Sequence, residues 1–132
     1  MSHTTTRGLH TALHWRASAL YVIAHLDGGE TPPTGYTAAL KRFLSWVLAG
    51  IAFEKYRKVT PGVRPASAMC ALSIAKKAYG IKNLIVLQKV AKKHLELVKR
   101  AGAHQEFKGN AAEKRSLRKF LSAIVAAAAE EG

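Results

Sequence analysis

The chain has 132 residues, of which 48% are apolar and 22% charged, a composition typical of one folded domain rather than of a disordered segment. Its charge is unusual, because 21 Lys and Arg face only 8 Asp and Glu, for a net charge of +13. Cys70 is the only cysteine, which excludes an intrachain disulfide and a thiolate zinc site. The longest apolar stretch, Phe43 to Phe53, is too short to cross a bilayer.

The positive charge is concentrated in the middle of the chain. Residues 1–54 carry a net charge of +1, residues 55–119 carry +14, and residues 120–132 carry −2. A basic domain of this size is typical of proteins that bind a polyanion such as nucleic acid, an acidic membrane surface or an acidic protein. The sequence therefore places the candidate binding surface in residues 55–119.

The hydrophobic periodicity predicts an all-α fold, a four- to five-helix bundle with an N-terminal helical arm. Residues 1–35 are expected to form the arm helix and a linker after a flexible start over residues 1–6, and residues 36–132 the bundle, within a single domain. The expected helices span residues 7–26, 36–58, 65–79, 81–101 and 110–130.

Several residues predict where these helices begin and end. Gly28 and Gly80 follow helical segments and can adopt the left-handed conformation that ends a helix. Thr34 or Thr37 is the expected N-cap of the second helix. Asn110, three residues before Glu113, has the spacing of a capping box at the start of the last helix.

The centre of the second helix is apolar on all sides, so it should be covered on every side. Either a neighbouring subunit supplies part of the cover, or this helix is the central one of a monomeric bundle. The large aromatic residues are expected to anchor the core or an interface; these are Trp15, Tyr21, Phe43, Trp46 and Phe53. The last helix should pack through one apolar face formed by Leu117, Phe120, Leu121, Ile124 and Ala128.

The fourth helix has the clearest functional pattern. At about 100° per residue, its apolar positions Leu84, Leu87, Ala91, Leu95 and Val98 share one face. Four cations fall on the opposite face: Lys82, Lys89, Lys93 and Arg100. Acidic residues that could pair with them at i,i+4 are almost absent, so the row is expected to contact an external polyanion rather than to be a solvated face. Supporting phosphate contacts are expected from Arg64, Lys76, Lys77, Lys114, Arg115 and Arg118.

Other chemistries have little support in the sequence. His10 and His14 have the i,i+4 spacing of metal ligands, but no third ligand lies nearby, so we expect no metal site and no cofactor. The acidic residues are scattered, and neither a phosphate-binding glycine loop nor a nucleophile motif is present. The chain is therefore not expected to be an enzyme or to bind a small-molecule substrate. Small residues along 66–78 favour close helix packing, or close approach to a phosphate chain.

Three segments resemble the C-terminal half of the major coat proteins of filamentous archaeal viruses of the rudivirus, lipothrixvirus and tristromavirus type. They are Arg64-Pro65-Ala66-Ser67-Ala68 with Leu72-Ser73-Ile74-Ala75-Lys76-Lys77, the helix through Lys89 to Lys99, and Leu121-Ser122-Ala123-Ile124-Val125. The resemblance covers residues 60–128 and rests on pattern rather than on a diagnostic motif.

This resemblance implies a capsid protein that dimerises with itself or with a paralogous coat protein. Such dimers form a helical filament around linear double-stranded DNA in A-form, assembled in the host cytoplasm and located in the virion. The residues alone leave other interpretations open. These are a small helical subunit of an RNA-guided interference complex, and a cellular chromatin-type or transcription-factor DNA-binding protein, including a helix-turn-helix over residues 66–100.

Overall fold

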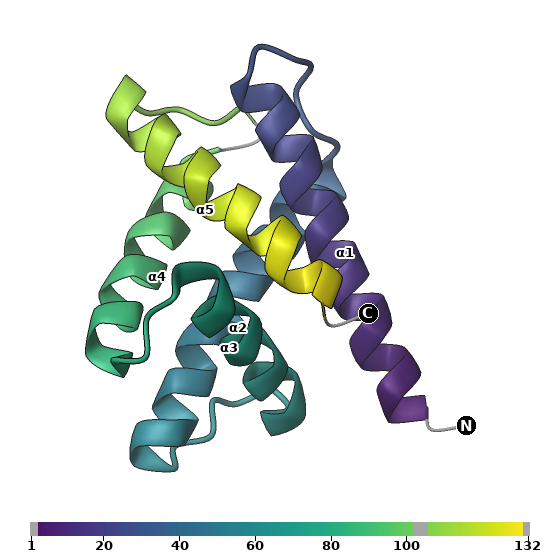
Figure 1. Ribbon diagram of the computed structural model, residues 1–132, viewed down its shortest axis with the longest axis vertical. Coiled ribbons are helices and arrows are strands. Elements are labelled where there is room, and N and C mark those ends of the chain that lie inside the picture. Colours follow the sequence, from purple (N-terminus) through teal and green to yellow (C-terminus); the bar gives the residue numbers. More distant parts are fainter. Residues whose placement is uncertain (1–2, 102–105, 131–132) are drawn as a thin grey trace.

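The computed structural model describes the backbone of residues 3–101 and 106–130, and the side chains of residues 12–33, 35–101 and 106–129. Within these ranges the chain forms α-helices joined by loops and no strand, which confirms the predicted all-α bundle (Figure 1). The helices are α1 (His3–Leu26), α2 (Thr34–Tyr56), α3 (Pro65–Tyr79), α4 (Leu84–Lys99) and α5 (Ala111–Glu130).

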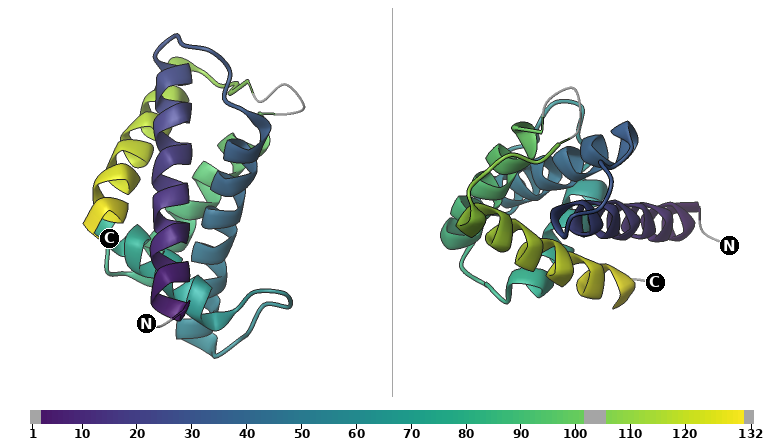
Figure 2. Two further views of the ribbon diagram at one scale, coloured as in Figure 1. Left: turned by 90° about the vertical axis from the view of Figure 1, so that its right-hand side faces the viewer. Right: turned by 90° about the horizontal axis from the view of Figure 1, so that it is seen from above.

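Helix α2 lies at the centre of the bundle. It packs against α1, α3 and α4, while α5 crosses α1 and α3 on the other side (Figures 1 and 2). Phe43, Leu44 and Val47 are consequently buried. Most of the apolar centre of α2 is therefore covered by other helices of the same chain, as in the second of the two interpretations.

The segment predicted as an arm belongs to the core from Ala12 onward. Ala12, Trp15, Ala19 and Val22 are each almost fully buried. The Trp15 ring lies 4.8 Å from the Phe43 ring, edge to face. Only the N-terminal end of α1 projects past the other helices (Figure 1). The helix begins at His3, so the expectation of a flexible start over residues 1–6 is wrong from that residue on.

Two of the predicted helix ends are confirmed by their hydrogen bonds. Gly80 ends α3 with a positive φ of 63°, which glycine adopts without steric cost. The capping box of α5 is reciprocal: Glu113 N–H donates to Asn110 Oδ1 (2.8 Å) and Asn110 N–H donates to Glu113 Oε1 (3.1 Å).

Two predicted helix starts are wrong. Helix α2 begins at Thr34 with Pro33 at the N-cap, so neither Thr34 nor Thr37 caps it. Thr37 is instead buried inside the helix. Helix α4 begins at Leu84 rather than at Ile81, because Asn83 Oδ1 accepts hydrogen bonds from the backbone N–H of Ile85 (2.9 Å) and Val86 (3.2 Å).

The end of α2 also differs from the prediction. The helix stops at Tyr56, and Arg57 adopts a left-handed conformation with φ 54° and ψ 27°. Its N–H donates to Phe53 O (2.9 Å), and the next N–H, of Lys58, donates to Ala52 O (3.4 Å). This pattern satisfies carbonyl groups that the end of a helix leaves free.

Helices α2 and α3 approach each other closely at Gly50. A Cβ at this position would lie 2.7 Å from Ala68 O and 3.0 Å from Leu72 Cβ. Ala68 and Ala71 on α3 are buried against α2. Ala68 therefore serves close helix packing, whereas Ala66 and Ser73 on the same helix are exposed.

Candidate nucleic-acid interface

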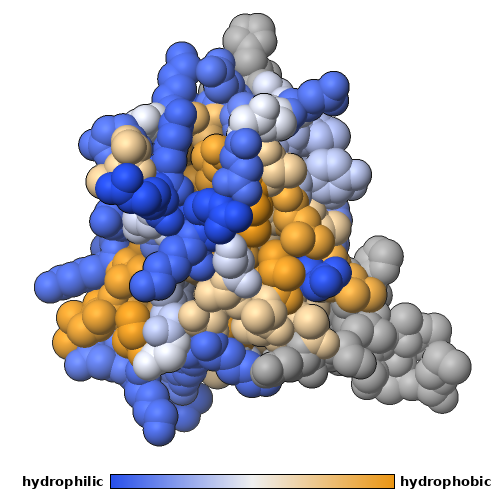
Figure 3. All heavy atoms as spheres, turned by 45° about the horizontal axis from the view of Figure 1, so that its top comes forward, coloured by the Kyte–Doolittle hydropathy of each residue, from blue (hydrophilic) through white to orange (hydrophobic). Residues whose placement is uncertain are grey.

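The outward face of α4 carries three exposed lysines within little more than one helical turn. Lys89, Lys92 and Lys93 are all exposed on it, and none has a carboxylate partner among the residues that the structure describes. The opposite face is buried as predicted, with Leu87, Ala91, Leu95 and Val98 in the core and Leu84 partly buried. Figure 3 shows long hydrophilic side chains projecting from the molecule with hydrophobic residues between them.

The predicted row of four cations is shortened at both ends. Lys82 precedes the helix, because Asn83 caps it, and so Lys82 does not continue the helical spacing. Arg100 lies at the C-cap, and its guanidinium donates to Glu113 Oε2 at 3.0 Å. Lys89 and Lys93, one helical turn apart and about 6 Å along the axis, are the members that keep the predicted geometry.

Three of the predicted phosphate contacts have carboxylate partners within the chain. Lys76 Nζ lies 3.0 Å from Glu54 Oε2, which links α3 to α2. Arg118 donates two hydrogen bonds to Asp27, Nε to Oδ1 at 2.7 Å and Nη2 to Oδ2 at 2.9 Å, which links α5 to the end of α1. Together with Arg100, these cations hold helices together, and this role was not foreseen in the sequence.

The ion pairs also shift the pKa values of their members. The hydrogen bond from Arg118 holds the pKa of Asp27 below its ordinary value, and the same contact raises the pKa of Arg118. The pKa of Glu113 is lowered first by the Asn110 N–H and then by Arg100, with a smaller contribution from Lys93.

The remaining predicted contacts are spread over the surface. Arg64 is exposed at the N-cap of α3, and Lys114 and Arg115 are exposed on the first turns of α5. These three have no carboxylate partner among the described residues. Lys77 is exposed but has an interaction within the chain. Lys92 and Lys99 are also exposed on α4, but they lie beside the predicted row of cations and were not predicted as contacts.

An open hollow of about 270 Å³ lies between α3, α4 and α5. It is lined by Ala78, Tyr79, Val90, His94, Ser116, Lys119, Phe120 and Ala123. His94, one of the lining residues, is only 3% exposed. Each of its ring nitrogens has a hydrogen-bond partner: Tyr79 Oη lies 2.7 Å from Nδ1, and Ser116 Oγ lies 3.2 Å from Nε2. Burial lowers the pKa of His94 to about 4, with a smaller contribution from Lys93.

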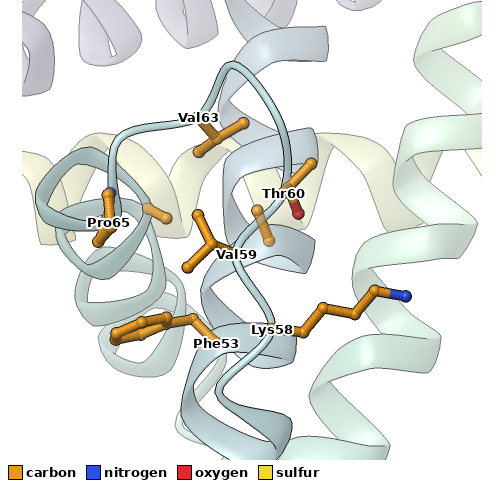
Figure 4. A pocket seen from close by; sticks show the side chains of 8 residues that line it. Phe53, Lys58, Val59, Thr60, Val63 and Pro65 are labelled. Carbon is orange, nitrogen blue, oxygen red and sulfur yellow. The ribbon is translucent and has the colours of Figure 1, made fainter.

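A second cavity lies beneath the connector between α2 and α3 (Figure 4). Phe53, Val59, Val63 and Pro65 surround it, whereas the Lys58 side chain extends away from it. Its volume of about 10 Å³ leaves space for at most a single water molecule. It is therefore a packing defect rather than a ligand site.

The structure offers no alternative site of the metal or membrane type within its described residues. No group of three His, Cys, Asp or Glu side chains is placed to hold a metal ion there. His14 is exposed beside Tyr36, and the side chain of His10 lies outside the described residues. None of the helices, over the described residues, has the length and apolarity needed to span a bilayer.

Comparisons with models of known families, with curated proteins and with solved structures give no match to this chain. The resemblance to filamentous-virus coat proteins therefore stays a prediction from the sequence pattern.

Proposed function

We propose that this protein is a structural nucleoprotein that coats duplex DNA through contacts to the phosphate backbone. The observation that carries the proposal is the outward face of α4, where Lys89, Lys92 and Lys93 are exposed without a carboxylate partner among the described residues. Like charges placed this close destabilise a helix unless an anion compensates them. A phosphate chain is the anion whose charges repeat along a line.

The contacts do not depend on base sequence. Lysine ammonium groups bind phosphates as point charges and position a protein on a duplex without reading base edges. One strand of duplex DNA carries a phosphate about every 3.4 Å of axis, so one helical turn of α4, about 5.4 Å, spans one to two phosphates of a strand. Binding releases counterions, and the affinity is expected to fall steeply with salt concentration.

Coating rather than local recognition follows from the total charge. A pair of chains at +13 each would neutralise roughly 26 phosphates, or about 13 base pairs of duplex. This favours packaging at a fixed ratio of protein to DNA, with the chain as the repeating unit of a helical filament, as the resemblance to virion coat proteins implies.

The test measures binding of the full chain to random-sequence duplex DNA over a series of salt concentrations. The Lys89→Glu, Lys93→Glu double variant should lose most of its affinity and reduce the salt slope by about 2. The matched control is Lys41→Glu with Arg42→Glu, which changes the net charge equally on α2. Circular dichroism checks that both variants keep their helicity.

Three outcomes would overturn the proposal. Equal loss of affinity in both double variants would mean that net charge, not the α4 face, determines binding. A preference for single-stranded RNA would favour the interference-complex subunit, and a strong preference for one base sequence would favour a chromatin-type or transcription-factor protein. The coat role further requires regular filaments in electron micrographs of the chain with linear duplex DNA.

A further inference from the structure

Helix α1 carries two apolar seams, and among the described residues only one of them packs against the rest of the chain. The first seam, Ala12, Trp15, Ala19, Val22 and Leu26, faces the core at alternating spacings of three and four residues. The second seam, Leu13, Ala17, Leu20 and Ala24, has the same alternation on roughly the opposite side of the helix. A helix that is apolar on two sides is normally packed on both.

The second seam is not covered by any part of the chain that the structure describes. Leu13 is 48% exposed and Leu20 is 42% exposed, and Tyr21 beside them is 48% exposed while its ring stacks on Tyr36 at 4.4 Å. The left view of Figure 2 looks onto α1 from outside, and no other helix of the described chain lies over it. Scattered apolar residues on a surface need no explanation, but a seam with heptad spacing does.

We infer that a second copy of this chain covers the seam, with α1 packing on α1 of its partner. This inference rests on the proposed assembling function and names the surface that joins two subunits. Alternating Leu and Ala at the seam suits close packing of two helices, because a Leu side chain can fill the space that an Ala leaves. A symmetric pair is the commonest form of self-association, and it brings the same seam of both copies together.

The charge distribution selects the same surface. Two chains of +13 repel each other over most of their surface, and residues 55–119 alone carry +14. Residues 1–54 carry only +1, and Arg16 is the single Lys, Arg, Asp or Glu between residues 12 and 26. Contact through α1 therefore joins the charge-poor parts of two copies and leaves the lysines of α4 free for DNA.

The test is sedimentation velocity of the full chain without nucleic acid, over a wide range of protein concentration and in salt high enough to screen repulsion. Wild type should sediment with twice the 14.3 kDa mass of the chain. Leu13→Glu with Leu20→Glu should raise the dimer Kd by at least about 100-fold, because dimerisation would bury two charges in each copy. Circular dichroism should show unchanged helicity, since both leucines are exposed in the monomer.

Val59→Glu is the control for an acidic side chain at an exposed apolar position away from α1, because Val59 is 53% exposed on the connector after α2. This variant should dimerise like wild type. The inference is overturned by a wild type that stays monomeric, by a dimer that survives both leucine substitutions, or by a Val59→Glu variant that loses the dimer equally.

The same variants separate this inference from the proposed function. If wild type dimerises through α1 but does not bind duplex DNA, the proposed coat function is wrong and the inferred dimer surface stands. If wild type binds duplex DNA as a monomer, the proposed DNA binding stands and the inferred α1 dimer is wrong.

Discussion

The hydroxyl of Tyr79 lies 2.7 Å from Nδ1 of His94, and the two rings are tilted by only 11°. Phe120 packs parallel to both, at 4.6 Å from the Tyr79 ring and 4.5 Å from the His94 ring. Nε2 of His94 reaches Ser116 Oγ at 3.2 Å. One buried imidazole therefore joins α3, α4 and α5 with its hydrogen bonds satisfied on both sides.

This arrangement predicts a pH dependence of stability. The pKa of His94 is about 4 in the folded protein and 6.5 ordinarily, so the unfolded chain binds the proton more readily. The free energy of unfolding should therefore be highest above pH 6.5 and fall by about 3 kcal/mol between pH 6.5 and pH 4. Urea unfolding at several pH values measures it.

His94→Gln is the control for this effect, because glutamine can make both hydrogen bonds but does not titrate. The variant should show a shallower pH dependence over the same interval, whatever its stability at neutral pH. The lowered pKa values of Asp27 and Glu113 add a loss of stability at still lower pH, which both proteins share. Parallel pH profiles for wild type and variant would contradict the burial of a neutral His94.

Gly50→Ala should destabilise the protein by about 1–3 kcal/mol, because the new methyl group would meet the backbone oxygen of Ala68 and force α2 and α3 apart. Gly35→Ala is the matched control on the same helix, since nothing lies within 4 Å of a Cβ there. It should be neutral or stabilise by up to about 1 kcal/mol. Thermal unfolding compares the two, and equal stability would argue against the close approach at Gly50.

Asn83→Ala should lower the free energy of unfolding by about 1 kcal/mol, because two N–H groups at the start of α4 lose their acceptor. Asn83→Asp keeps an acceptor at the same place and adds a negative charge near the helix N-terminus, so it should retain the stability. Denaturant titration distinguishes the variants. The cap would have no role if both unfold at the same midpoint.

Arg115 and Arg118 lie three residues apart on α5 but should respond differently to substitution by Gln. Arg118→Gln breaks the bidentate pair with Asp27 and should lower the melting temperature in low salt. Arg115→Gln should leave the melting temperature unchanged and reduce the salt slope of DNA binding by about 0.9. The assignment of Arg118 to helix packing fails if the two effects are exchanged.

Local sequence signals predicted much of the fold. The apolar face of α5, from Leu117 to Ala128, is buried as its spacing indicated. Gly80 and the pair Asn110–Glu113 mark helix ends because their conformational and hydrogen-bonding preferences act over a few residues. Tyr21 lies outside the core, since it is 48% exposed and stacks on Tyr36, so of its two predicted roles only that of an interface anchor stays open.

Pairings between distant segments could not be predicted in the same way. Asp27 and Arg118 are 91 residues apart in the sequence, and Glu54 and Lys76 are 22 apart. Their contact depends on the packing of whole helices, so these cations resembled free ones in the sequence. The burial of His94 depends in the same way on distant residues, because Tyr79 and Ser116 reach its two ring nitrogens from α3 and α5.

Arg57 combines a strained backbone conformation with a side-chain contact to α2. A left-handed residue at a helix end is commonly glycine, and an L-residue there costs about 1–2 kcal/mol. With arginine in this place, a guanidinium lies 5.7 Å from the centre of the Phe53 ring and beside the partly negative carbonyl end of α2. Exchange for glycine would relax the main chain but also remove the contact with the Phe53 ring, so the strain and the contact would be lost together.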